Sequence, residues 1–221
     1  MPLDKHIADF LAASSGAPQP ASLAELRVAT DVDLLRLQDE EETGGAIQHH
    51  VVIADDGYEI ELRVYTPAAS KAEIAQPAML FAHGGGWCLG SLSLYDRPCQ
   101  ALANATGRKI LSVDYRLAPE FPFPRPLEDV YQALCWENYL GDRRHPYAEP
   151  LRMASLRGVP PATILSCEYD PLRDEAEAYA RRLEEAGVPV RCERLPGMVH
   201  ACIHMSGLTP AARRLFERAC I

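Results

Sequence analysis

The string HGGGW at residues 83–87 holds the residue types that most directly indicate chemistry. Its three consecutive glycines carry no Cβ atoms, so the backbone N–H groups can turn toward one point and approach a ligand closely. A loop of this kind can stabilise a developing oxyanion, and each preorganised donor then lowers the barrier by about 3–4 kcal/mol. Because a tight turn alone needs only one glycine, the string favours an anion-stabilising loop.

An acid and an imidazole follow two later strands of the expected sheet. Asp170 comes soon after the strand expected at 162–167, and His200 follows the strand expected at 188–195. Ligand sites of open α/β folds gather at the carboxyl edge of the sheet. In acyl transfer a histidine moves the nucleophile's proton while a carboxylate holds its tautomer. We therefore predict His200 as the acid/base and Asp170 as its partner, whereas Asp174 in the next helix fits a capping role.

Two other chemistries remain as alternatives. Residues 86–90 satisfy G-x-C-x-G, which would make Cys88 a thiolate nucleophile, although no cation or helix start near it favours the thiolate. His200 and His204 are four residues apart with Cys202 between them, so they could share a metal ion on one helical face. A third ligand is not evident, and we expect neither a metal nor a cofactor.

The elements that must position these residues follow an alternating pattern. An Asp-Asp-Gly turn ending at Gly57 separates two alternating segments, which predicts an antiparallel hairpin. From residue 77 onward, short apolar runs alternate with helical periods, which is typical of a mostly parallel sheet covered by helices. The expected strands are 47–54, 58–65, 78–82, 110–113, 162–167 and 188–195, and the expected helices of this region are 95–106, 127–140, 173–186 and 210–220.

The composition excludes several classes of protein. At 221 residues the chain can bury a sizeable core, and we expect a helical arm over 1–45 and one α/β core over 46–221. The net charge of -9 argues against nucleic acid as a partner, and the lack of an 18-residue apolar run argues against a membrane span. Seven cysteines without C-x-x-C predict reduced thiols and a cytoplasmic location.

Together the motifs resemble the hormone-sensitive-lipase-like branch of the α/β-hydrolases, the carboxylesterases with an HGGG motif. The resemblance extends over nearly the whole chain and includes the strings DYRLAPE at 114–120, EYDPLRD at 168–174 and GMVH at 197–200. It implies an α/β-hydrolase-type, mostly parallel sheet with an antiparallel N-terminal hairpin and helices on both faces. It also implies hydrolysis of small acyl esters or similar apolar molecules. The site residues that it implies are the oxyanion donors Gly85 and Gly86, the supporting His83 and Gly84, and the catalytic Asp170 and His200.

The chain departs from this family at the nucleophile. The family's serine lies in G-x-S-x-G on a strained turn between a strand and a helix, and none of the ten serines here has that setting. Residues up to Trp136 resemble the helix before this elbow, whereas residues from Glu137 resemble a stretch well after it. About 80 to 100 residues are missing by this comparison, roughly two βα units and a loop. Three interpretations follow: a hydrolase that is inactive or very weak, a non-catalytic protein that binds a small ligand, or a truncated product with no function of its own.

Loss of the central strands would leave N–H and C=O groups unpaired in the middle of the sheet. We therefore expect the strand at 162–167 to pair in parallel directly with the strand at 78–82. The alternatives are that a void remains, or that a second copy fills it and makes a homodimer.

Overall fold

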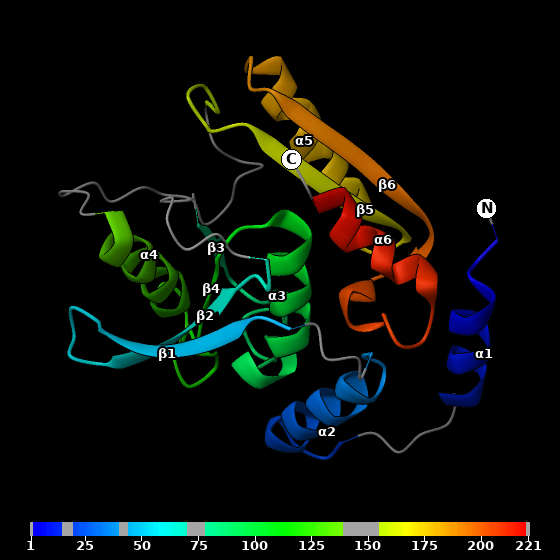
Figure 1. The fold of residues 1–221 in the computed structure, drawn as a ribbon, viewed down its shortest axis with the longest axis horizontal. Helices are drawn as coiled ribbons and strands as arrows, with labels where there is room; N and C mark the ends of the chain where they lie inside the picture. The colour runs from blue at the N-terminus through cyan, green and yellow to red at the C-terminus, as the bar shows by residue number, and fades with distance from the viewer. Residues whose placement is uncertain (1, 15–19, 40–43, 70–77, 139–154, 220–221) are drawn as a thin grey trace. The chain divides into compact units, whose positions relative to one another are not determined.

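The computed structural model describes residues 2–14, 20–39, 44–69, 78–138 and 155–219. The contacts divide the chain into two compact units, which are described separately (Figure 1). Unit 1 comprises Met1–Pro18 with Arg144–Ile221, and unit 2 comprises Gln19–Arg143. The end of the helix expected at 127–140 and the stretch that follows it lie outside the described residues. No helix within the described ranges is long and apolar enough to cross a bilayer.

Unit 2 contains a four-stranded sheet in the order β1-β2-β4-β3. The strands are β1 (Ala46–Ile53), β2 (Glu59–Thr66), β3 (Met79–Phe81) and β4 (Ile110–Val113). The expected hairpin is confirmed, because β1 and β2 are antiparallel and Gly57 adopts φ 85° in the turn between them. β3 and β4 are parallel, as expected for strands joined by a helical crossover.

Two helices of unit 2 cover opposite faces of this sheet, α3 (Leu92–Thr106) and α4 (Arg125–Asn138). Successive side chains of a strand point to opposite faces. Along β2, Ile60 and Leu62 pack in a core cluster with Ala133 of α4. The alternate residue Arg63 pairs instead with Asp96 of α3. The expected helices on both faces are therefore present in this unit.

The start of α3 differs from the expectation by three residues. The helix was expected to begin near Tyr95, but it begins at Leu92 because the Ser91 side chain caps it by accepting the N–H of Leu94. Gly107 ends the helix in the left-handed conformation, φ 66°. The helix therefore begins directly after the glycine loop and holds the C-terminal end of that loop in place.

Unit 1 contains a parallel strand pair with helices around it. Its elements are α1 (Lys5–Ser14), β5 (Ala162–Tyr169), α5 (Arg173–Glu185), β6 (Val190–Val199), the short 3₁₀ helix η2 (Cys202–His204) and α6 (Pro210–Ala219). The buried Leu183 of α5 packs with Leu156 and Val188 beside the strand pair. An ion pair between Glu177 of α5 and Arg194 of β6 ties the helix to the strand at 2.6 Å, and it lowers the pKa of Glu177 to about 2.

Each unit pairs its own strands. Within the described residues β5 pairs in parallel with β6 through the local α5 crossover, and β3 pairs in parallel with β4. The expected pairing of the strand at 162–167 with the strand at 78–82 would join the two units, so it stays a prediction.

Candidate active site

Asp170 and His200 meet at the carboxyl edge of the β5–β6 pair. The last paired residues of the two parallel strands are Tyr169 and Val199, so Asp170 and His200 are the next residues of their strands. The Nδ1 atom of His200 lies 3.0 Å from Oδ2 of Asp170. The carboxylate is 15% exposed and the imidazole 58%. The pair therefore combines a sheltered carboxylate with an imidazole that solvent can reach.

The Asp170 carboxylate is oriented by the turn into α5. Its Oδ1 atom accepts the backbone N–H of Leu172 at 2.8 Å, which leaves Oδ2 for the histidine. An ionised carboxylate only accepts hydrogen bonds, so Nδ1 of His200 carries the proton and Nε2 is left as the base. Asp174, expected as a capping residue, instead pairs with the neighbouring Arg173 at 2.8 Å.

The loop that ends in His200 is held by residues that sequence reasoning missed. The N–H of Gly197 donates to the Glu168 carboxylate at 2.7 Å, and the pKa of Glu168 is lowered by this hydrogen bond. The carbonyl of Gly197 accepts the N–H of Asp4 at 3.1 Å, just before α1. The Asp4 carboxylate in turn accepts the Thr209 hydroxyl at 3.1 Å. These contacts hold the end of β6 from two separate parts of the chain.

The glycine loop in unit 2 has a backbone that only glycine can adopt readily. Gly85 has φ 135°, and a Cβ atom there would overlap the carbonyl oxygen of Leu89. That same turn is closed by the N–H groups of Cys88 and Leu89, which donate to the carbonyl of Gly85. Gly86 has φ 59°. No hydrogen bond between described residues uses the N–H groups of Gly85 and Gly86, which leaves both donors available to a ligand.

His83 is a buried aromatic support of this loop. Its ring stacks on Tyr115 with a centroid separation of 4.3 Å and on Tyr95 at 5.3 Å. The Tyr115 hydroxyl donates to the carbonyl of His83 at 2.6 Å, and Nδ1 of His83 lies 2.9 Å from the carbonyl of Gly84. Burial lowers the pKa of His83. The neutral ring and its stacking partners therefore keep the first glycine of the loop in position.

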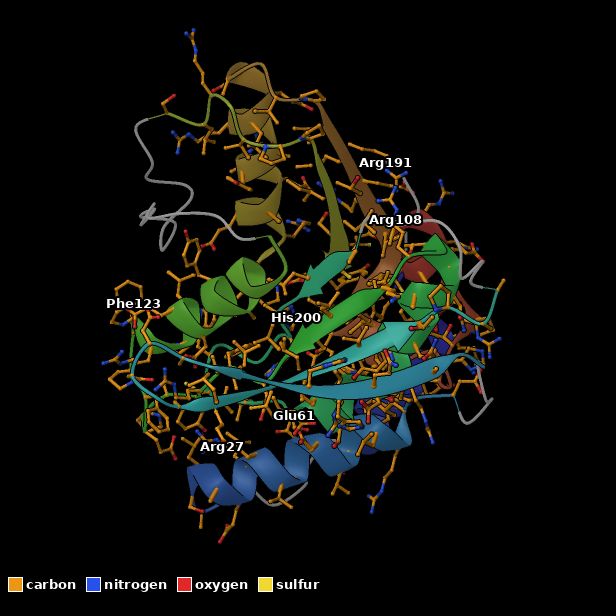
Figure 2. The ribbon with its side chains drawn as sticks, turned by 60° about the vertical axis from the view of Figure 1, so that its left-hand side comes forward. Arg27, Glu61, Arg108, Phe123, Arg191 and His200 are labelled. Atoms are coloured by element: carbon orange, nitrogen blue, oxygen red, sulfur yellow. The ribbon has the colours of Figure 1, made fainter. Side chains whose placement is uncertain are left out.

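Arg27 and Asp31 of α2 (Leu23–Arg36) hold the far side of the glycine loop. Arg27, labelled in Figure 2, donates from Nε to the carbonyl of Cys88 at 2.8 Å and from its terminal nitrogen to the carbonyl of Ala118 at 2.8 Å. The Ser91 hydroxyl donates to Asp31 at 2.7 Å. Sequence reasoning missed Arg27, because a charged residue of a helix has no local signal for a partner 61 positions away.

The metal alternative gains no support from the described residues. His204 is fully buried in η2, whereas His200 is exposed and faces Asp170. Within the described part of the chain, no three His, Cys, Asp or Glu side chains are grouped as metal ligands. The alternative role of Cys88 as a thiolate nucleophile stays a prediction. Cys88 is half-buried, and its backbone carbonyl accepts a hydrogen bond from Arg27.

The burial of His83 leads to a pH prediction. The unfolded chain has a histidine pKa near 6.5, and the folded value is lower, so below about pH 6.5 the unfolded state binds more protons. Stability is therefore expected to fall as the pH drops from 7.5 to 5. In His83→Gln the part of this loss of stability that comes from His83 should be absent. Urea unfolding midpoints of both proteins at pH 7.5 and pH 5 measure the loss. An equal loss of stability in the two proteins would contradict a buried neutral His83 ring.

Comparisons with known proteins identify the family of the chain. A family model described as alpha/beta hydrolase fold matches residues 79–140 and 133–204, more than half of the chain. An arylesterase of Saccharolobus solfataricus is 25% identical, with 91% of this chain and 92% of the relative covered. A carboxylesterase of Mycobacterium tuberculosis is 28% identical, with 96% and 90% covered.

Solved structures are similar over the same extent. A thermostable esterase from Pseudomonas putida superposes with a TM-score of 0.86 at 26% identity, covering 99% of this chain and 95% of that one. The chain therefore belongs to the hormone-sensitive-lipase-like carboxylesterase family of the alpha/beta hydrolases.

Proposed function

We propose that this chain carries the acid/base and oxyanion parts of a carboxylic-ester hydrolase for small acyl esters, without the family's nucleophile. The observation that carries the proposal is the 3.0 Å contact between Nδ1 of His200 and the Asp170 carboxylate. It leaves Nε2 as a base on an exposed ring. The esterase names of the relatives support the substrate class.

The proposed chemistry divides between two groups. Nε2 of His200 takes the proton of the attacking group and returns it to the alcohol oxygen that leaves, while Asp170 stabilises the imidazolium. The N–H groups of Gly85 and Gly86 donate to the oxygen that becomes negative in the tetrahedral intermediate. The availability of both N–H groups supports this role, since a donor already bonded within the protein contributes little to an oxyanion.

The missing nucleophile is inferred from the sequence and from the way the relatives align. No serine lies in G-x-S-x-G, and two described serines have structural partners, since Ser91 caps α3 and Ser166 donates to Glu177. The family model matches in two segments that meet near residues 133–140. The alignment to the arylesterase extends over 287 residues, although this chain has 221. These facts support an internal deletion near residues 136–137.

The first test is hydrolysis of p-nitrophenyl acetate. We expect at most weak activity, which no single serine substitution removes, because His200 and the glycine loop can only assist water. Residual catalysis of this kind is roughly 10³ to 10⁴ over the uncatalysed reaction. A fluorophosphonate probe should label no serine stoichiometrically, and unique labelling of one serine would contradict the proposal. Cys88→Ser should leave the rate unchanged, whereas its loss would favour the thiolate alternative.

A non-catalytic ligand-binding protein is the second candidate. The N–H groups of Gly85 and Gly86, which no hydrogen bond between described residues uses, favour it, because such donors can bind an ester or carboxylate without turnover. Titration calorimetry with butyrate and ethyl butyrate tests this, and binding that Gly85→Ala weakens while no product forms would support it.

Within either function we propose a cytoplasmic location, which the free thiols of the described cysteines favour, and a homodimer through unpaired strand edges. The division into an arm over 1–45 and a core over 46–221 also stays a proposal.

A further inference from the structure

Two cysteines that are far apart in the sequence lie close together in the segments that carry Asp170 and His200. The Sγ atoms of Cys167 and Cys202 lie 3.4 Å apart, although the residues are separated by 35 positions. Cys167 is 7% exposed and Cys202 1% exposed. Cys167 belongs to β5 at the irregular step before Tyr169, and Cys202 begins η2 just after β6. Both lie in unit 1, so the fold of this unit brings them together.

We propose that Cys167 and Cys202 are a redox modification site, which hydrogen peroxide converts into a reversible disulfide. A disulfide bond is about 2.05 Å long, so the two sulfur atoms need to approach by only about 1.4 Å. Cys167 is the last regularly paired residue before the register shift in β5, where the ladder is irregular and can accommodate a small shift. The proposal concerns the thiols alone and holds whether or not the chain hydrolyses esters.

The two thiols are not equivalent, and the difference gives each a role. The Cys202 thiol can donate a hydrogen bond to the Cys167 sulfur, which lowers the pKa of Cys167 and raises that of Cys202. The Cys167 thiolate therefore attacks the peroxide, forms an S–O bond and releases one water after proton transfer. The Cys202 sulfur then attacks the sulfenic sulfur, the S–O bond breaks, and a second water leaves. Overall, two thiols and one peroxide give one disulfide and two waters.

The disulfide would connect the two segments that carry the candidate catalytic pair. Cys167 lies three residues before Asp170, and Cys202 lies two residues after His200. A bond between them would connect the end of β5 to the turn after β6. These are the two segments that carry the 3.0 Å contact between His200 and Asp170. Because it closes a loop of more than 30 residues, it would also restrict the unfolded chain and stabilise unit 1.

Other described cysteines lack this setting. Cys99 is fully buried in α3, where burial raises the pKa of its thiol to about 12. Cys192 is exposed on β6, and the pKa of its thiol is also raised by partial burial. Cys192 is therefore the control for a solvent-accessible thiol in the same unit.

The test is peptide mapping of the full chain after treatment with hydrogen peroxide. Trypsin releases residues 158–173 and residues 195–213 as separate peptides, each with one cysteine. In a non-reducing digest we expect a cross-linked pair of these two peptides, which dithiothreitol separates. The melting temperature of the oxidised chain should rise by about 5 °C or more and return after reduction.

Variants distinguish a specific site from general oxidation. Cys192→Ser should form the same cross-linked peptide with the same temperature shift. Cys202→Ser keeps a hydrogen-bond donor beside Cys167 but cannot form the disulfide. It should lose both, and should instead trap Cys167 as a sulfenic acid that dimedone labels. The proposal is overturned if the unmodified chain shows no 158–173 to 195–213 cross-link while Cys192 is oxidised. It is also overturned if Cys167 resists dimedone in a Cys202→Ser chain that melts cooperatively. Neither result depends on ester hydrolysis.

Discussion

Insertion of an elbow segment from an esterase of the family between Trp136 and Glu137 is expected to raise p-nitrophenyl acetate hydrolysis by up to about 10⁶-fold. This is the size of the loss when the nucleophile is removed from a complete triad, because the remaining groups cannot replace the attacking atom. The insertion point lies near the end of α4 (Arg125–Asn138), where the two family segments meet. Steady-state rates of the chain with and without the insert measure the effect.

Three variants of the inserted chain test the roles of individual groups. An insert whose elbow serine is replaced by alanine should give no gain. His200→Ala should abolish the gain, and Asp170→Asn should reduce it by about 10⁴-fold, since the histidine then loses its tautomer partner. A gain that survives His200→Ala would contradict the acid/base role of this residue. An inserted chain that folds but shows no gain in activity would contradict the proposed deletion.

Removal of the Asp129 carboxylate is expected to cost about 3–5 kcal/mol of folding free energy. Asp129 is fully buried and accepts both the backbone N–H of Arg116 at 2.9 Å and its Nε at 2.8 Å. The guanidinium also pairs with Asp56 and lies 4.5 Å from the ring of Tyr58. In Asp129→Ala this cation stays buried with half of its partners gone. Urea unfolding followed by tryptophan fluorescence measures the loss.

The neighbouring Glu128 provides the matched control. Glu128 is 42% exposed and pairs with Arg125 on the surface of α4. Exposed ion pairs contribute at most about 1 kcal/mol, so Glu128→Ala should change stability little. Equal losses for the two variants would show that Arg116 finds other partners and that its burial does not depend on Asp129.

Local patterns were enough to predict most elements and the two ends of the site. The hairpin around Gly57 followed from alternation and a turn residue, because strand period and glycine conformation are local properties. The Asp170–His200 contact also followed, because each residue comes just after a strand and parallel strands end at one edge. A glycine that must take φ 135°, as Gly85 does, likewise leaves its mark in the residue type.

The tertiary structure decided which strands pair and what surrounds the site. β5 pairs with β6, and β3 pairs with β4, through crossovers whose partners a short apolar run does not specify. Arg27 reaches the loop at Cys88, and Cys167 meets Cys202, through contacts between residues 61 and 35 positions apart. Such contacts leave no local signature, because a helical arginine or a buried cysteine is compatible with many partners. They are specified only when the whole chain packs.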